Sequence, residues 1–243
     1  MLGIVAGHDP DDSTTSEKPV PDYEALLEGG VRGLKIGFSL PDSIVPVDPQ
    51  IGAALQAAAD TLGRLGATIR PATLPDFTAL YRAAEVIVKC EAAAMHRPWM
   101  EANAPYANQV RTRMEAGFFI PATQYIDALR LRAHFVREFL AEAMEGVDAV
   151  MLPAIPFPVP TIAETDVEAS GGPATLSMVA RFTGLTRPFN TLGLPALSVP
   201  CGFDTNGAPI GLQLIGRPFD EALLYRVGHA YQGATDHHRK VPA

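Results

Sequence analysis

Cysteine and histidine are the residue types of this chain that could supply a thiol nucleophile or a metal site. The two cysteines, Cys90 and Cys201, fall inside a predicted helix and a predicted strand, and both are interpreted as small buried hydrophobic residues. The one adjacent histidine pair, His237 and His238, lies in a polar terminal segment typical of a solvated tail. Because no H-E-x-x-H or C-x-x-C spacing occurs, we expect neither a metal nor a cofactor.

Serine chemistry would need a glycine-framed loop that exposes the hydroxyl. Ser39 lies in Gly-Phe-Ser-Leu-Pro, which lacks the second glycine of a G-x-S-x-G elbow. The chain also lacks the Gly-Lys-Ser/Thr and G-x-G-x-x-G loops that cradle phosphates. The sequence therefore indicates neither an elbow serine nor a nucleotide-phosphate site.

The segment from Pro188 to Gly216 is the most informative stretch of the sequence. Two apolar runs, Ala196–Phe203 and Pro209–Ile215, flank the tetrapeptide Asp-Thr-Asn-Gly at positions 204–207. Asn-Gly readily takes the positive φ values of a tight turn, and the flanking Val, Ile and Leu residues suit a half-buried sheet. The pattern predicts a β-hairpin.

The same segment resembles the C-terminal motif of the amidase signature family, whose members hydrolyse or transfer amides with a Ser, Ser, Lys triad. The resemblance rests on thirteen positions: Pro188, Asn190, Gly193, Pro195, Ala196, Ser198, Pro200, Gly202, Gly207, Pro209, Gly211, Gln213 and Gly216. Four further segments are similar to successive parts of the family's second half: residues 7–12, 33–37, 148–153 and 219–224. The resemblance thus covers essentially the whole chain and implies the C-terminal half of such an enzyme.

That resemblance implies that the family's catalytic residues lie outside the chain. The family places its nucleophile in a GGSSGGS loop, whose glycines let backbone N–H groups approach the oxyanion. The nearest segment here is Ser-Gly-Gly-Pro at positions 170–173, which is interpreted as a connecting loop. The family's base is a buried lysine acting through a second serine. None of the four lysines has a serine at a sequence spacing that would indicate such a Lys and Ser pair. The four are Lys18, Lys35, Lys89 and Lys240.

Substrate-binding residues are implied by the same resemblance. Residues 182–190 look like the family segment that lines the acyl pocket, and Thr183, Thr186 and Asn190 are its polar members, able to bond an amide. The alternative is that these side chains satisfy the backbone of a turn before the hairpin. Arg113 is similar in position to an arginine with which some members hold a substrate carboxylate, and the alternative is a surface helix arginine.

The element order predicts one α/β domain over residues 1–243, a mixed β-sheet with helices on both faces. Strands are expected at 33–39, 67–70 and 147–152, the first two parallel because a helix joins them. Helices are expected after Asp48 and Pro49, over 77–102 with a break or kink at Pro98, over 121–145, near 174–182, and from Asp220.

Composition favours a cytoplasmic globular protein. The chain is 47% apolar, and its net charge of −8 argues against a nucleic-acid partner. The longest apolar run is broken by prolines and no secretory signal is recognised, so no membrane association is expected.

The expected function is the scaffold and substrate-pocket portion of an amidase, inactive alone and able to bind a small amide only when an N-terminal half completes it. An exposed sheet edge favours self-association or a partner chain. Two alternatives stay open: one chain of a split amidase, and a non-catalytic binding or assembly protein.

Overall fold

The computed structural model describes all residues except 43, 166–180 and 241–243. The described residues contain one five-stranded sheet in the order β2-β1-β3-β5-β4. Its strands are β1 (Lys35–Phe38), β2 (Thr68–Pro71), β3 (Ala149–Pro153), β4 (Ala196–Phe203) and β5 (Pro209–Ile215). β1 pairs in parallel with β2 and β3, whereas β5 is antiparallel to both β3 and β4. The predicted mixed sheet is confirmed.

The first crossover follows from strong local signals. Helix α2 (Pro49–Arg64) begins after Asp48, whose Oδ1 accepts a hydrogen bond from Gln50 N at 2.8 Å, and Pro49 occupies the first turn. Gly66 then turns the chain into β2 with φ +102°, a value that disfavours residues with a Cβ. β1 and β2 are parallel, as predicted from the intervening helix.

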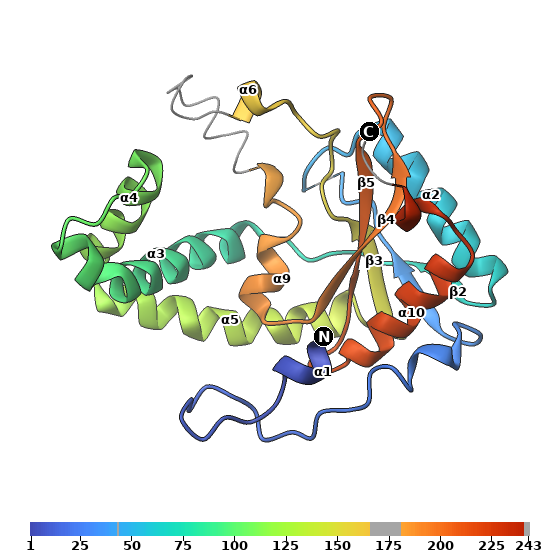
Figure 1. Cartoon of the computed structure of the whole chain (residues 1–243), viewed down its shortest axis with the longest axis horizontal. Helices are drawn as coiled ribbons and strands as arrows, with labels where there is room; N and C mark the ends of the chain where they lie inside the picture. Colours follow the sequence, from blue (N-terminus) through green and yellow to red (C-terminus); the bar gives the residue numbers. More distant parts are fainter. Residues whose placement is uncertain (43, 166–180, 241–243) are drawn as a thin grey trace.

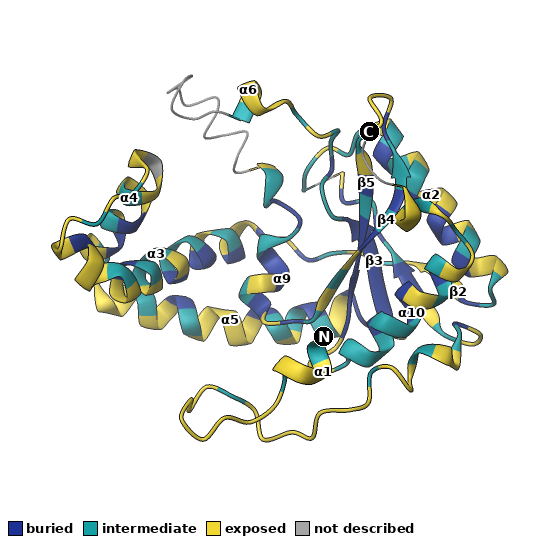
Figure 2. Cartoon of the chain, viewed as in Figure 1, coloured by how far each residue is buried: buried dark blue, intermediate teal, exposed yellow. Residues whose placement is uncertain are grey.

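Helices cover both faces of the sheet (Figure 1). α2 and α10 (Glu221–Gly233) pack on one face, and α3 (Thr78–Glu101), α5 (Ala122–Glu142) and α9 (Arg187–Leu192) on the other. β3 shows the reason in its alternation, since Met151 belongs to the first cluster and Val150 and Leu152 to the second. Figure 2 shows the buried residues along the sheet between these layers. β3 is buried throughout because it is the central strand.

Helices α3 and α5 run beside each other away from the sheet, with α4 (Asn108–Glu115) at the far end of the arm (Figure 1). Of the break or kink predicted at Pro98, the break is wrong, because α3 continues to Glu101, and the kink stays a prediction. Pro98 lies in the last turn of α3, so its missing N–H removes one hydrogen bond near the end of the helix and leaves the rest of the helix intact. Ala102 N still donates to the carbonyl of Pro98 at 3.1 Å. The turn η2 (Ala116–Phe119) then leads into α5.

The predicted hairpin is confirmed, and its loop differs in detail from the sequence expectation. Gly207 takes φ +81°, whereas Asn206 keeps a negative φ. Asp204 organises the loop instead: its Oδ1 accepts hydrogen bonds from Asn206 N at 2.8 Å and Ala208 N at 2.9 Å. The loop is longer than a two-residue turn, so one positive φ is enough to reverse the chain.

The remaining described elements are short: α1 (Leu2–Val5), η1 (Leu27–Gly29), α6 (Ile162–Thr165) and η3 (His237–Arg239). The Ser-Gly-Gly-Pro segment at 170–173 and most of the helix expected near 174–182 lie outside the described residues. Within the described ranges, no helix combines the length and apolarity needed to cross a membrane.

Candidate functional site

A cavity of about 300 Å³ lies between α3, α4, α5 and the segment that leads into α9. It contains all four side chains that the sequence suggested for substrate binding. Arg113 comes from α4, Thr183 and Thr186 precede or begin α9, and Asn190 lies within α9. The other lining residues are Ala84, Glu85, Ile87, Val88, Glu91, Arg132, Arg187 and Thr191. Helix packing therefore brings together residues that are distant in sequence, and we call this cavity the α9 pocket.

A chain of charged contacts crosses the α9 pocket. Glu85 on α3 accepts from Arg187 Nη1 at 2.9 Å and pairs with Lys89 Nζ at 2.9 Å. Arg187 Nη2 donates to Thr183 Oγ1 at 2.8 Å. Sequence reasoning missed Glu85 and Arg187 as site residues. The spacing of Glu85 and Lys89 signals a helix ion pair, but nothing in the sequence links Glu85 to a residue 102 positions away.

Glu85 is the carboxyl group on which the positive charges of Lys89, Arg187 and Arg113 act. Partial burial acts to raise the pKa of this carboxyl group. The hydrogen bond from Lys89 and the positive charges of Lys89, Arg187 and Arg113 together act more strongly in the opposite direction, so the pKa of Glu85 lies below its usual value. Glu85 is consequently ionised at neutral pH and balances part of the positive charge in the pocket.

Two contacts fix the segment before α9 in place. The hydroxyl of Tyr81 on α3 donates to the carbonyl of Gly184, and burial raises the pKa of Tyr81. From the sheet side, Gln213 Nε2 on β5 donates to the carbonyl of Leu185 at 2.7 Å and to that of Pro153 at 3.0 Å. Because a buried carbonyl without a donor is costly, these bonds specify the position of the segment.

The alternative role of the polar side chains was to satisfy the backbone of this turn. The turn is closed by main-chain bonds, in which the Thr183 carbonyl accepts from Thr186 N at 3.2 Å and Arg187 N at 2.8 Å. Thr186 is the N-cap of α9 without a side-chain capping bond. The side-chain amide of Asn190 has no hydrogen-bond partner among the residues that the structure describes. These two side chains are thus available to the cavity.

Arg113 occupies a mixed position. It lies on a helix at the molecular surface, as the alternative predicted, and it also lines the α9 pocket and a neighbouring hollow of about 210 Å³ beside Lys89 and Met114. Arg132 of α5 lines the same pocket. Besides Arg187, which pairs with Glu85, the guanidinium groups of Arg113 and Arg132 therefore border the cavity.

The cysteines and lysines, which are the candidate nucleophiles and bases of the sequence, do not form a catalytic arrangement among the described residues. Burial raises the pKa of the Cys201 thiol to about 12, so this cysteine is a buried hydrophobic residue as predicted. Cys90 is half-buried, and burial raises its pKa as well. Lys18 lies over the ring of Phe219, 4.0 Å from its centre. Within the part of the chain that the structure describes, no lysine side chain hydrogen-bonds to a serine, and the contact of Lys18 with Ser16 Oγ at 3.2 Å is made by its backbone N–H.

His237 departs from the expected solvated tail. Its ring stacks on Tyr231 and its centre lies 6.1 Å from the ring centre of Phe203, so η3 packs on β4 and α10, whereas His238 is exposed. Among the described residues, no group of three or more His, Cys, Asp and Glu side chains is arranged to hold a metal ion.

Comparison with known proteins gives a consistent result. Residues 1–225 match the family described as Amidase. A glutamyl-tRNA(Gln) amidotransferase subunit of Thermosynechococcus vestitus is 35% identical over 266 residues, covering 100% of this chain and 54% of that protein.

Two solved structures show the same fold. A glutamyl-tRNA(Gln) amidotransferase subunit of Thermotoga maritima has a TM-score of 0.64 and 27% identity over 92% of this chain and 47% of its own. A 6-aminohexanoate cyclic dimer hydrolase has a TM-score of 0.79 over 99% of this chain and 53% of its own, at 22% identity. The chain therefore spans about half the length of the relatives it matches.

Proposed function

Because the chain belongs to the amidase family, we propose that its 243 residues are the C-terminal portion of an amidase-type amide hydrolase. In this proposal they supply the scaffold and one wall of the substrate pocket. The nucleophile, the base and the oxyanion loop come from residues outside these 243. The hairpin motif at Pro188 to Gly216 and the lack of a GGSSGGS loop support the C-terminal assignment.

The α9 pocket is the observation that carries the proposal. Thr186 and Asn190 offer a hydroxyl and an amide without bonds to the turn backbone, and Arg113 adds a positive charge. Hydroxyl and amide groups can donate to an amide carbonyl and accept from its N–H. The chemistry of the cavity therefore suits a small substrate with an amide and a negatively charged or polar neighbouring group.

The side chains of the chain itself support the absence of a catalytic core. The family's base must be a lysine that loses its proton through burial, whereas Lys18, Lys35 and Lys240 are exposed and Lys89 pairs with Glu85. The thiol of Cys201 is too weakly acidic to act as a nucleophile at neutral pH. We therefore expect no amidase activity from the isolated chain.

Assays of the purified 243-residue chain test this expectation. Glutamine, simple aliphatic amides and aryl amides are the substrates, and released ammonia or amine is measured. We expect no turnover above the buffer rate. Turnover that disappears on replacing Lys89 or Ser198 with alanine would contradict the proposal.

Completion by a chain that carries the GGSSGGS loop tests the assignment directly. Activity should appear when the two parts are combined, and Thr186→Val and Asn190→Ala should then each lower kcat/KM by about tenfold, as expected for one lost hydrogen bond. Thr61→Val, on α2 across the sheet, is the matched control and should leave kcat/KM unchanged. If the chain were equivalent to the N-terminal half, a partner with that loop would restore nothing.

Membership of a multi-chain enzyme is the second candidate function. It is favoured by relatives that are named as subunits of glutamyl-tRNA(Gln) amidotransferase. Co-purification of the chain with a partner from its own cell, followed by amide hydrolysis in the complex, would support it. Ligand binding in the α9 pocket together with stable assembly and no hydrolysis would favour a binding or assembly protein. The cytoplasm is the proposed location for all three.

A further inference from the structure

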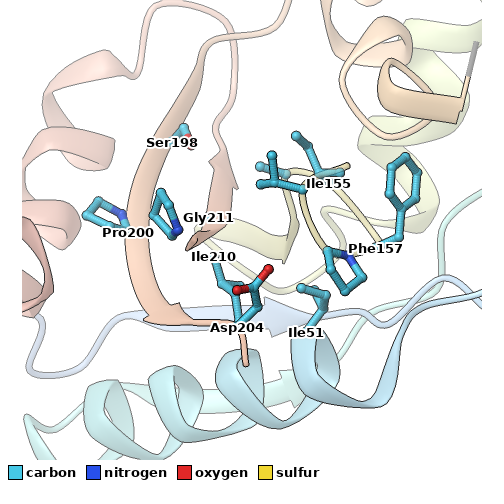
Figure 3. A pocket seen from close by; sticks show the side chains of 12 residues that line it. Ile51, Ile155, Phe157, Ser198, Pro200, Asp204, Ile210 and Gly211 are labelled. Atoms are coloured by element: carbon cyan, nitrogen blue, oxygen red, sulfur yellow. The ribbon is translucent and has the colours of Figure 1, made fainter. Parts of the chain in front are cut away.

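A second cavity, of about 270 Å³, lies beside the β4–β5 hairpin and the first turn of α2. It is formed by the exposed side of the hairpin and by residues 154–159, which follow β3. Figure 3 shows Ile51, Ile155 and Ile210 around it, with Gly211 on the hairpin side. The lining is otherwise apolar except for Ser198 and one carboxylate, that of Asp204.

Asp204 is the unusual member of this lining. The residue is 7% exposed, and its carboxylate points toward the cavity (Figure 3). Its Oδ1 accepts two hydrogen bonds, from the backbone N–H groups of Asn206 and Ala208. Its Oδ2 is buried and receives no hydrogen bond from any described residue. A buried carboxylate oxygen without a donor is costly, and a cation that bonds to it recovers that cost.

The loop does not need this second oxygen. Both loop hydrogen bonds go to Oδ1, so an asparagine at position 204 would close the hairpin equally well and would avoid the buried charge. The carboxylate therefore points to a positively charged donor that arrives from the cavity, which adjoins the residue.

The lining and position of the cavity identify the occupant. An apolar wall with one carboxylate suits the alkyl stem and the cationic head of a single side chain. It lies on the exposed face of the outermost strand pair, where Ala196, Ser198 and Val159 are accessible. The relatives are about twice as long as this chain. The part of each relative that this chain does not match is therefore about as large as the chain itself and can cover such a face.

We propose that Asp204 anchors a lysine or arginine side chain of the amidase part that lies outside these 243 residues. The cationic head bonds to Asp204 Oδ2, and its alkyl stem lies against Ile155 and Ile210. This inference rests on the proposed function, since it takes the covering part to be the remainder of an amidase. It makes the two parts recognise each other by charge as well as by apolar contact.

Side-chain mimics test the anchor in the chain as it exists. n-Butylammonium and n-butylguanidinium are titrated against the purified chain, with n-butanol as the neutral analogue, and the amide NMR shifts of Asn206 and Ala208 are followed. We expect saturable binding of at least one cation. Asp204→Asn should weaken it by about tenfold to a hundredfold, the usual worth of a charged hydrogen bond. Asp60→Asn, an exposed carboxylate on α2, is the control and should change nothing.

Three outcomes of this titration would overturn the proposal: no binding of either cation, equal binding of n-butanol, or binding that Asp204→Asn leaves intact. A fourth overturning outcome comes from benzylammonium. If benzylammonium binds about tenfold more tightly than n-butylammonium, the cavity is a site for a free small molecule and not for a side chain.

Thermal unfolding gives an independent measurement. In the isolated chain, Asp204→Asn should leave the melting temperature equal or higher, because it removes an unpaired buried charge and keeps both loop bonds. Asp204→Ala should lower it, because the loop bonds are lost. A melting temperature lowered equally by both changes would mean that the charge is already satisfied, against the proposal. Amide turnover by the isolated chain would reject the proposed function and leave these results untouched.

Discussion

Glu85 is the residue of the α9 pocket that forms ion pairs with both Lys89 and Arg187. It holds Arg187, which in turn bonds to Thr183, so one carboxylate on α3 orients the polar end of the segment before α9. Its pKa is lowered because three cations outweigh the effect of partial burial. A group with a lowered pKa in the folded state stabilises the protein above its unfolded pKa. That stability is lost as the pH falls through the folded pKa.

Glu85→Gln should therefore destabilise the chain at neutral pH. Because the side chain is 39% exposed, the loss should be that of a surface network, about 0.5–1 kcal/mol. The difference from the unchanged chain should vanish as the pH falls below the folded pKa of Glu85. Urea unfolding at a series of pH values measures it. Asp127→Asn, which breaks the exposed 3.5 Å pair with Arg130, is the control, and an equal loss there would refute the special position of Glu85.

Gln213 is the buried polar residue that ties the sheet to the pocket. Gln213→Leu keeps the volume but removes the donor to the carbonyls of Leu185 and Pro153. The expected loss is about 2–4 kcal/mol of unfolding free energy, since two buried acceptors lose their donor. Chemical denaturation measures this loss. Gln56→Leu, on the exposed side of α2, should cost far less, and comparable losses would show that the buried bonds are unimportant.

At the scale of elements, the arm of α3, α4 and α5 decides whether the α9 pocket exists. η2 crosses α3 so closely that a Cβ on Gly117 would lie 2.0 Å from the carbonyl oxygen of Lys89. That contact is with backbone, which cannot turn aside as a side chain can. Glycine at this position therefore sets the distance between α3 and the chain that carries α4 and Arg113.

Gly117→Ala should push η2 away from α3, destabilise the chain by about 1–3 kcal/mol and disturb the pocket. Gly63→Ala is the same change on α2, where the new methyl would find its nearest neighbour at 3.9 Å. It should stabilise the chain by up to about 1 kcal/mol, because alanine favours a helix. Melting temperatures of both variants test the contrast, and a shift of the same sign in both would contradict this account.

At the scale of the whole molecule, the sheet has an open side. β4 pairs with β5 and is the last strand in the order, so among the described residues no strand bonds to its outer edge. Ala196 and Ser198 on this strand are exposed. An unpaired edge with accessible small residues is a surface on which a further strand or a second copy can pair.

The isolated chain should consequently self-associate as its concentration rises, and Ala196→Lys should weaken that association by about tenfold or more, since charges on an edge oppose pairing. Sedimentation velocity over a range of concentrations measures it. Ala53→Lys, at an exposed position of α2, adds the same charge elsewhere and should have little effect. A chain that stays monomeric at all concentrations would count against an open edge.

The sequence by itself determined the strands, the long helices and the family, whereas the short helices α4 and α9 were not predicted. The strands at Ala196–Phe203 and Pro209–Ile215, and the Asp-Pro start of α2, follow from local patterns that are correct because each acts within a few residues. The resemblance at Pro188 to Gly216 likewise needed no structure. Local reasoning was wrong at Pro98, where the end of the helix made the proline harmless, and at Asn206, where Asp204 shaped the loop.

Tertiary structure alone decided which residues meet. Glu85 reaches Arg187, and Arg113 lines one cavity with Asn190, because α3, α4 and α9 pack together, and no periodicity in the sequence encodes such a crossing. The same holds for the buried, unpaired oxygen of Asp204, which reads in sequence as an ordinary turn residue. Side-chain burial and long-range hydrogen bonds depend on contacts between distant segments, so they become visible once the chain is folded.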